Sequence, residues 1–324
     1  MTGRKLLWET SNPSVLVVIP HYVGPPVGEK VKYGSTVEGA AADRARALSR
    51  TIAGLRESLG NNQARVERRE VFVTKDGPEP RIDPSRSRLV FKPANTGLMA
   101  SRVDIVVATV AGRHALDRVD VPKEWFSVEE MTLERLGGDP RMLGLACHDI
   151  LAERADGSGW VCYVEDDIVV SDPWFLRKIA HVEAATEGEA VLLPNRFERR
   201  PSRTIDKLYV DGPVRPDFSA AWQDIAADPG LRFNHVGEPV TLERPSNPHA
   251  GCFFLTAGQF ARWRAQPFFG DRDAGFIGPL ESAATLGLMR TFRLYKPIRQ
   301  NAAYLEVEHV NNRPWLGLRD DAED

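Results

Sequence analysis

The stretch WVCYVEDDIVV, residues 160–170, decides the fold of this 324-residue chain. Its first five residues are apolar or aromatic, and such a run predicts a strand that is buried in the middle of a sheet. Glu165, Asp166 and Asp167 follow directly, and a buried strand cannot hold them because each charge would lose its hydration without gaining a partner. We therefore place the three carboxylates at the carboxyl end of the strand. In open α/β sheets, ligands bind at this edge.

A helix is predicted after the acidic residues. Ser171, Asp172 and Pro173 supply an N-cap and a first-turn proline, and the apolar residues at 175, 179 and 182 share one helical face. Clustered carboxylate oxygens suit Mg²⁺ or Mn²⁺, which keep bound water and also bind substrate phosphates. The alternative is a solvated turn in which Asp172 only caps the helix.

Composition limits the classes of function. The net charge of −3 argues against a protein that binds nucleic acid through bulk electrostatics. The three cysteines, Cys147, Cys162 and Cys252, have no CxxC spacing and are expected to be reduced core thiols. We find no signal-peptide pattern at residues 1–13 and no apolar stretch of membrane-spanning length, so we expect a soluble, cytoplasmic protein.

Strands and helices alternate along the chain, which predicts an α/β protein with a mostly parallel sheet. A strand at 15–19, an amphipathic helix at 41–59 closed by Gly60 and a strand at 70–74 predict a right-handed βαβ unit. Further strands are expected at 88–91, 104–110, 191–193, 252–255, 292–295 and 304–310, and helices from 140 and 278. We interpret 196–207 as a basic loop and 211–247 as a long excursion that covers a site.

Five segments, in this order along the chain, resemble the GT-A class of nucleotide-sugar-dependent glycosyltransferases, in particular their family 2-like members. They are VVIPHY (17–22), YVEDDIVVSDPWFL (163–176), HAGCFFL (249–255), GPLES (278–282) and EHVNNRP (308–314). In that class the similar segments form the first strand, the DxD metal corner, the wall of the donor pocket, the helix that carries the catalytic carboxylate, and a histidine segment at the metal. This chain departs from the DxD pattern at its first position, which is Glu165.

The resemblance implies a single GT-A-like domain. In it, residues 13–170 form the nucleotide-binding half, residues 171–315 the donor and acceptor half, and residues 316–324 a flexible acidic tail. It also implies a metal-dependent glycosyltransferase that moves a sugar from a nucleoside diphosphate sugar, expected to be UDP-linked, to an acceptor hydroxyl with inversion. Asp167 and His309 would hold Mn²⁺ or Mg²⁺, and Glu281 would be the general base. The residues expected to contact the nucleotide sugar are Pro20, His21, Tyr22, Asp76, Glu165, Asp166 and Gly251.

Each assignment has an alternative. Glu281 could serve only to cap the helix and to interact with its dipole, and His309 could be a core histidine on the face of Leu305 and Val307. His249 could line the pocket or belong to an ordinary loop, and the arginines of 196–203 could grip phosphate or be solvated.

Two other functions remain open. A sugar-phosphate nucleotidyltransferase is disfavoured, because residues 20–26 lack the glycine-rich basic loop that such enzymes carry after the first strand. The third reading is a non-catalytic carbohydrate- or metal-binding protein. The sugar, the acceptor and the oligomeric state are not predicted.

Overall fold

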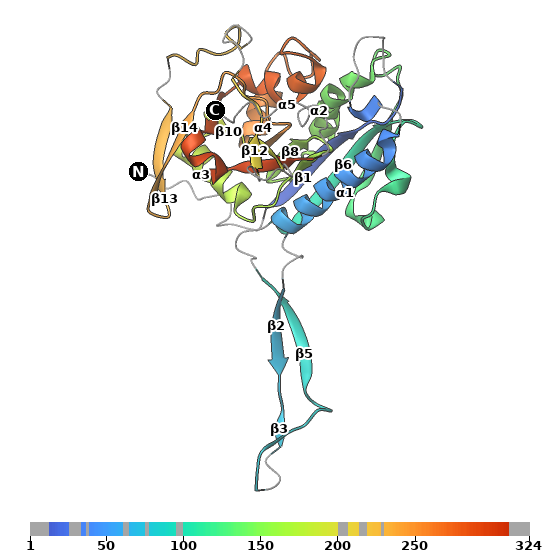
Figure 1. Ribbon diagram of the computed structural model, residues 1–324, viewed down its shortest axis with the longest axis vertical. Coiled ribbons are helices and arrows are strands. Elements are labelled where there is room, and N and C mark those ends of the chain that lie inside the picture. Colours follow the sequence, from blue (N-terminus) through green and yellow to red (C-terminus); the bar gives the residue numbers. More distant parts are fainter. Residues whose placement is uncertain are drawn as a thin grey trace, which may run out of the picture.

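A five-stranded sheet with the order β15-β8-β1-β6-β7 lies at the centre of the molecule (Figure 1). Four of its strands are parallel: β1 (Ser14–His21), β6 (Arg102–Val110), β7 (Ser127–Met131) and β8 (Trp160–Val164). The fifth, β15 (Cys252–Thr256), pairs antiparallel with β8. This computed structural model describes residues 13–25, 34–36, 39–60, 65–74, 78–94, 100–199, 207–213, 219–227 and 230–310. The predicted mostly parallel α/β sheet is confirmed, whereas the finer GT-A assignment stays a prediction.

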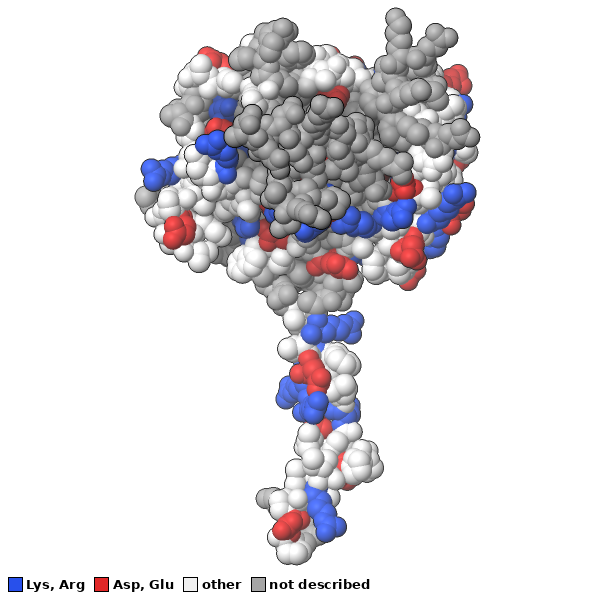
Figure 2. Space-filling view, in the orientation of Figure 1, with Lys and Arg blue, Asp and Glu red and all other residues white. Residues whose placement is uncertain are grey.

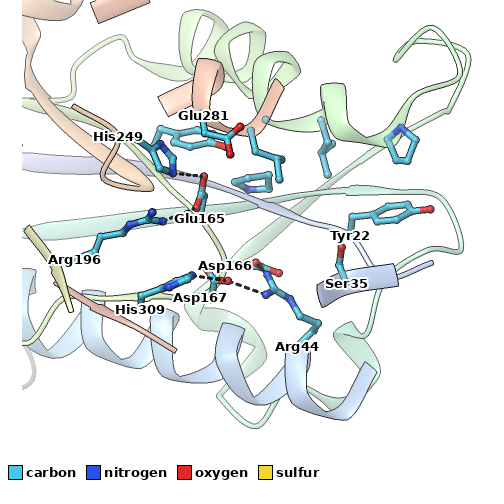
Figure 3. Close-up of a pocket in the computed structure, with 16 residues that line it drawn as sticks. Tyr22, Ser35, Arg44, Glu165, Asp166, Asp167, Arg196, His249, Glu281 and His309 are labelled. Carbon is cyan, nitrogen blue, oxygen red and sulfur yellow. Dashed lines mark hydrogen bonds and ion pairs between the residues drawn. The ribbon is translucent and has the colours of Figure 1, made fainter. Parts of the chain in front are cut away.

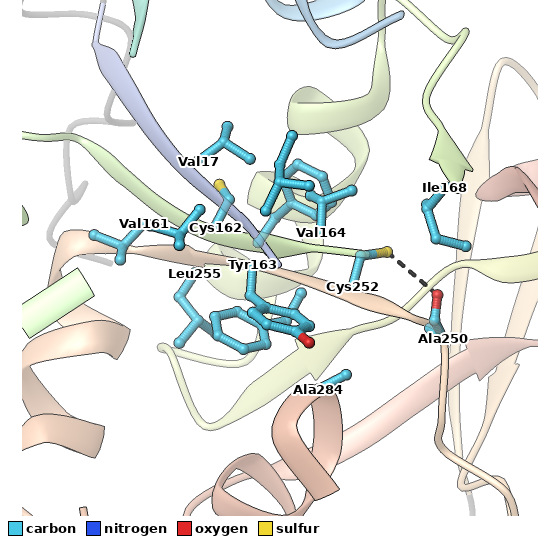
Figure 4. Close-up of a cluster of buried hydrophobic side chains, with 14 of the residues drawn as sticks. Val17, Val161, Cys162, Tyr163, Val164, Ile168, Ala250, Cys252, Leu255 and Ala284 are labelled. Carbon is cyan, nitrogen blue, oxygen red and sulfur yellow. Dashed lines mark hydrogen bonds between the residues drawn. The ribbon is translucent and has the colours of Figure 1, made fainter. Parts of the chain in front are cut away.

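The sheet is covered on both faces. Successive side chains of a strand point to opposite sides, so neighbouring residues report on the packing of each face. On one face Tyr163 of β8 stacks on Phe253 of β15, with 5.6 Å between the ring centroids, and Trp263 packs against Phe253. On the other face the next residue, Phe254, meets Phe175 at 4.9 Å. Figure 4 shows this core around β8, where nearly every side chain is apolar. The unbroken apolar run of β8 is therefore explained by two covered faces.

Five α-helices occur in the described part of the chain and flank the sheet. They are α1 (Ala40–Leu59), α2 (Leu143–Arg154), α3 (Phe175–Ala185), α4 (Ala257–Arg264) and α5 (Pro279–Met289). The predicted stripe on α1 is buried, and the helix ends at Gly60 as expected. Short 3₁₀ helices lie at Gly34–Thr36, Leu116–Arg118, Lys123–Trp125, Pro140–Met142 and Arg299–Tyr304. No helix in the described ranges is long and apolar enough to span a membrane.

Two four-stranded sheets come mainly from the second half of the chain. One contains β10 (Ala190–Leu192), β16 (Arg293–Pro297), β14 (Glu238–Glu243) and β13 (Leu231–His235). The other contains β12 (Lys207–Tyr209), β11 (Asn195–Arg199), β17 (Glu306–His309) and β9 (Ile168–Val169). The predicted basic loop at 196–207 is thus wrong at both ends, since β11 and β12 pair there around the undescribed residues 200–206. The expected excursion at 211–247 contains the β13–β14 hairpin.

A two-stranded ribbon projects from this body (Figure 1). It pairs β2 (Arg65–Glu70) with β5 (Arg88–Pro93), and further out β3 (Val73–Thr74) with β4 (Arg81–Ile82). The predicted parallel strand at 70–74 is therefore wrong. Val71, Phe72 and Val73 are exposed and follow the charged strand β2, whereas β6, with its buried apolar run, takes the place beside β1. The expected βαβ unit is formed by β1, α1 and β6.

The three cysteines are buried and unbridged, as expected of core thiols. Burial raises the pKa of each thiol, so these sulfurs stay protonated. Figure 4 shows Cys252 donating to the carbonyl oxygen of Ala250 at 3.4 Å.

Candidate functional site

A cavity of about 340 Å³ opens at the carboxyl ends of β1 and β8 (Figure 3). Seven of the predicted site residues line it: Pro20, Tyr22, Glu165, Asp166, Asp167, Glu281 and His309. It also takes in Ser35, Arg44, Tyr163, Arg196 and His249. The volume falls in the range of small-molecule sites, roughly 300–1,000 Å³. The parallel strands therefore deliver residues distant in sequence to one edge of the sheet, as predicted.

The acidic residues are held in a turn that leaves the sheet at the end of β8. The backbone N–H of Glu165 donates to Gly251 O at 2.8 Å, and that of Ile168 donates to Glu165 O at 3.1 Å. The carbonyl oxygen of Asp167 accepts from Val310 N–H at 2.9 Å. Backbone hydrogen bonds to Gly251 and Val310 therefore hold the turn at both ends. Each of its three carboxylates lies close to a basic side chain of the protein.

His21 fixes Asp166 from inside the protein. Its Nε2 accepts the backbone N–H of Ala115 at 3.1 Å, so the ring proton is on Nδ1 and is donated to Asp166 Oδ2 at 2.6 Å. Burial, helped by the charge of Arg44, lowers the pKa of His21 to about 3, and the ring stays neutral. His21 does not line the cavity. Its predicted contact with a nucleotide is therefore corrected to a positioning role.

Arg44 of α1 pairs with both aspartates of the turn. It contacts Asp166, and its Nη1 donates to Asp167 Oδ2 at 2.8 Å. Nearby, Thr51 of the same helix donates to the carbonyl oxygen of Asp166 at 3.1 Å. Helix α1 therefore compensates the charge of the acidic turn and fixes its backbone.

His309 faces Asp167 across the cavity floor (Figure 3). Its Nε2 lies 3.5 Å from Asp167 Oδ2, while Nδ1 is hydrogen bonded at 3.0 Å to Glu198. Strand pairing explains this position, since His309 of β17 is in register with Ile168 of β9. Burial opposes charge on His309, but Asp167 and Glu198 raise its pKa to about 9. Burial alone would raise the pKa of Asp167, yet Arg44 and His309 hold it well below its usual range.

Glu165 lies in a separate, mixed-charge part of the cavity. Its Oε2 is 3.9 Å from Arg196, and its Oε1 is 3.9 Å from His249 Nε2. Arg196 is held from behind by a bidentate pair with Asp211, which Lys296 also approaches at 3.5 Å. Burial and the neighbouring Asp167 raise the pKa of Glu165 to about 7. Burial and the charge of Arg196 lower the pKa of His249 far enough that its ring is neutral.

Gly251 makes room for Glu165 instead of lining the cavity. Its φ is +64°, and a Cβ there would lie 2.8 Å from Glu165 Oε2. Because it has no side chain, this glycine permits a close approach, and the group that approaches is a protein carboxylate. Its assignment as a nucleotide contact is corrected accordingly.

Glu281 reaches the cavity from the first turn of α5, whose N-cap is Gly278 (Figure 3). The helix has no side-chain cap, and no hydrogen bond or ion pair to Glu281 occurs in the described part of the chain. A capping role for Glu281 therefore has no contact to support it, whereas its favourable interaction with the helix dipole needs none. In Figure 3 the carboxylate of Glu281 faces the same space as Glu165 and His249.

The donor atoms around Asp167 bear on metal binding in two ways. Over the described ranges, no set of three or more His, Cys, Asp or Glu side chains is arranged to hold a metal ion. Two protein ligands can suffice, however, because Mg²⁺-type sites often combine one or two carboxylates with substrate phosphates and water. Asp167 Oδ1 and Glu165 Oε1 are buried without a hydrogen-bond partner, which is costly unless another group binds there. The carboxylate of Asp167 therefore fits a cation that shares its shell with a substrate, and His309, whose raised pKa keeps Nε2 protonated at neutral pH, joins that shell only by giving up this proton.

All five segments that carry the resemblance contribute residues to the cavity. Asp76 lies outside the described residues, as does the tail at 316–324. Sequence reasoning missed Arg44 and Glu198. Neither sits in a recognisable motif, and each meets the site only through tertiary packing. Tyr163, which also lines the cavity, belongs to the segment 163–176 but has no predicted role.

Searches against models of known protein families and against curated proteins found no match to this chain.

Proposed function

We propose that this protein is a metal-dependent glycosyltransferase that uses a nucleoside diphosphate sugar, with UDP as the expected nucleotide. The observation that carries the proposal is the convergence on one cavity of an acidic turn, a histidine from the last described strand and an unpaired carboxylate at a helix start. The alternative of a solvated turn does not explain why these residues meet in one cavity. Two oxygens of the acidic turn are buried without partners.

The two ends of the cavity suit different tasks. At one end, Asp167 and His309 would hold Mn²⁺ or Mg²⁺, and the cation would neutralise the charge that builds up on a departing diphosphate. Arg44 at the same end and Arg196 near the centre supply fixed positive charge for phosphate oxygens.

At the other end, Glu281 is free to accept a proton from an acceptor hydroxyl. A general base must lie within hydrogen-bond reach of the proton that it removes, and among the described residues no hydrogen bond or ion pair competes for the oxygens of Glu281. Tyr22, at the mouth, offers an aromatic face for a base. Displacement with inversion follows if the acceptor occupies the Glu281 side and the diphosphate the Asp167 side.

The direct test is nucleotide release. The purified protein is incubated with UDP-sugars and Mn²⁺, and free UDP is measured, first as slow hydrolysis and then with candidate acceptors. Thermal shift with each nucleotide sugar, with and without Mn²⁺, identifies the donor, because a ligand that binds only the folded state raises the melting temperature. Tight UDP binding without release under any acceptor would favour a binding protein, and no Mn²⁺-dependent shift with any nucleotide would refute the proposal.

Asp167→Ala provides the matched variant. It should abolish Mn²⁺-dependent UDP binding and leave the fold intact, since Arg44 keeps Asp166 as a partner. Asp172→Ala, which removes an acid that pairs with Lys178 outside the cavity, is the control and should bind as the unchanged protein does. An unaltered metal titration in Asp167→Ala would remove this residue from the site.

A further inference from the structure

The ribbon is an insertion that the central fold does not require. It leaves the body after Gly60 and returns at Ala100, and these two residues form a bridge, with Ala100 N–H donating to Leu59 O at 2.6 Å. The connection between α1 and β6 is thereby closed at its base. Connections in α/β units usually take about 2–6 residues, yet here residues 61–99 intervene. An insertion of this length that forms its own paired strands suggests a function separate from connecting α1 to β6.

The ribbon exposes apolar side chains along its whole length. Of the twelve large apolar side chains that are exposed in the described ranges, seven belong to it: Val66, Val71, Phe72, Val73, Ile82, Leu89 and Phe91. Their exposed fractions run from 42% to 63%. Exposed apolar groups in such a concentration mark an interaction surface. An isolated two-stranded hairpin is also marginal in water, so a third strand would stabilise it.

The register shows that both faces of the ribbon are apolar in part. Val66 lies opposite Lys92 on one face, whereas Phe91 lies opposite Glu67 and Leu89 opposite Arg69 on the other. A membrane surface would take up only one face. A neighbouring strand that extends the ribbon leaves both faces available for packing, and the outer edge of β5 has no partner among the described strands.

The charge of the ribbon points to its partner. Residues 65–93 contain eight basic and five acidic residues, in a chain whose net charge is −3. Strand β5 itself, RLVFKP, has two cations and no acid. Figure 2 shows Lys and Arg interspersed with uncharged side chains along the ribbon.

The body carries a complementary edge at β7. This strand, SVEEM, ends the central sheet, and its outer side pairs with no other described strand. It exposes Val128 at 46% and carries Glu129 and Glu130. The surrounding residues 116–134 contain six acidic and two basic residues. An acidic free edge with an exposed valine thus matches a basic free edge with exposed apolar residues.

We infer that the ribbon docks on a second copy of this chain, with β5 adding to the free edge of β7. Each copy has one ribbon and one β7 edge, so mutual exchange closes a two-fold dimer with two identical contacts. Because successive side chains of a strand alternate between its two faces, Arg88 and Lys92 of β5 then lie on the face of Glu130 and Val128 of the other copy. Leu89 and Phe91 lie on the opposite face beside Glu129, whose charge Arg154 already compensates. This inference does not depend on the proposed catalytic activity.

The test is the oligomeric state of the full chain, measured by light scattering after size exclusion and by sedimentation. The protein should have twice its 36.0 kDa chain mass across about 1–100 μM, which detects dissociation constants near the micromolar range. Two charge-reversed proteins, Arg88→Glu with Lys92→Glu, and Glu129→Lys with Glu130→Lys, should each be monomeric because like charges then face each other. Circular dichroism confirms that both remain folded.

Mixing the two monomeric variants gives the decisive result. The reversed ribbon of one meets the reversed edge of the other, and the unchanged ribbon meets the unchanged edge, so a mixed dimer should form. Arg264→Glu with Arg299→Glu reverses two exposed arginines elsewhere and should leave the dimer intact. A monomeric parent protein, a dimer that survives both reversals, or monomers that do not associate on mixing would each overturn the inference.

Discussion

Glu198 shows how a residue outside the cavity can control one inside it. Its carboxylate holds Nδ1 of His309 at 3.0 Å, which leaves Nε2 directed at Asp167. Carboxylate partners of this kind fix the orientation and basicity of ligating histidines. The sequence offers no sign of this pairing, because the two residues are 111 positions apart and meet only through the β11–β17 contact.

Glu198→Gln should weaken the Mn²⁺-dependent affinity for UDP by about 10–100-fold, the usual loss when a carboxylate that supports a ligating histidine is removed. Calorimetric titration of UDP at several Mn²⁺ concentrations measures the effect. Glu306→Gln changes a carboxylate on the same strand that pairs with Lys207 instead, and it serves as the control. Equal affinities in the two variants would show that Glu198 does not act through His309.

Glu281→Gln should leave UDP affinity nearly unchanged and slow sugar transfer by roughly 10²–10⁴-fold, the range for a lost general base. The geometry supports this split, since Glu281 lines the cavity without bonding to any group in the turn of Asp167. Steady-state kinetics with the donor found in the screen separate turnover from binding. Substantial activity in this variant would assign the proton to another group.

The acidic turn was predictable at this scale because its signal is local: an apolar run that stops at three carboxylates. His309 and Glu281 entered through the order of short motifs, and the structure does bring them to the same cavity. Arg44 and Arg196 were harder to predict as residues of the cavity. An arginine on a helix or near a strand start looks solvated in sequence, and only packing reveals that both are nearly enclosed by acidic partners.

Helix α1 is the element that supports the site. Besides Arg44 and Thr51, its Ser58 donates to Val170 O at 3.0 Å, so it is bonded along the acidic turn and β9. Close contact is made possible by Gly54, where a Cβ would lie 2.7 Å from Val170 O. The amphipathic stripe predicted the helix, but nothing in the stripe predicted which loop it would hold.

Gly54→Ala should therefore destabilise the protein by up to about 2 kcal/mol, because a clash with backbone costs roughly 1–3 kcal/mol and the gain in helix propensity offsets only about 1 kcal/mol. Denaturant unfolding measures the change. Gly258→Ala in α4 is the control: the nearest atom to its Cβ is 3.9 Å away, so stability should hold or rise. A stabilised Gly54→Ala would show that α1 can shift away from β9 at little cost.

The incorrect strand at 70–74 has a physical cause at the same scale. Val71, Phe72 and Val73 have high strand propensity, and they do form extended structure next to and within β3. Propensity gives no information on burial, however. The flanking charges of β2 and β4 keep these residues in a ribbon, and the parallel position passes to β6, whose run is apolar for longer.

The molecule as a whole should lose stability in mild acid. Burial lowers the pKa of His148 to about 4 and that of His21 to about 3, both below the 6.5 of an exposed ring. The unfolded chain therefore binds more protons than the folded one as the pH falls below about 6.5. The contribution of these two rings is fully present above that pH and declines toward pH 4. Glu165, whose pKa is raised from 4.5 to about 7, acts in the opposite direction over that range, but one carboxyl does not offset two rings.

His148→Gln should reduce the slope of unfolding free energy against pH by about 1 kcal/mol per pH unit near pH 5, since one buried ring contributes up to that amount. Urea titrations at several pH values between 4 and 7 measure the slope. His181→Gln replaces an exposed histidine and should leave the slope as it is. An identical slope for His148→Gln would mean that the ring is protonated in the folded protein.

The closed base of the ribbon makes this segment an excisable module. Since the chain departs and returns at bridged residues 60 and 100, a gene that joins these codons through a short turn should encode a body with an unaltered melting temperature and an intact cavity. Self-association and chemistry would then be separable by one deletion. Related proteins could gain or lose the ribbon in evolution without a change in the fold of the body.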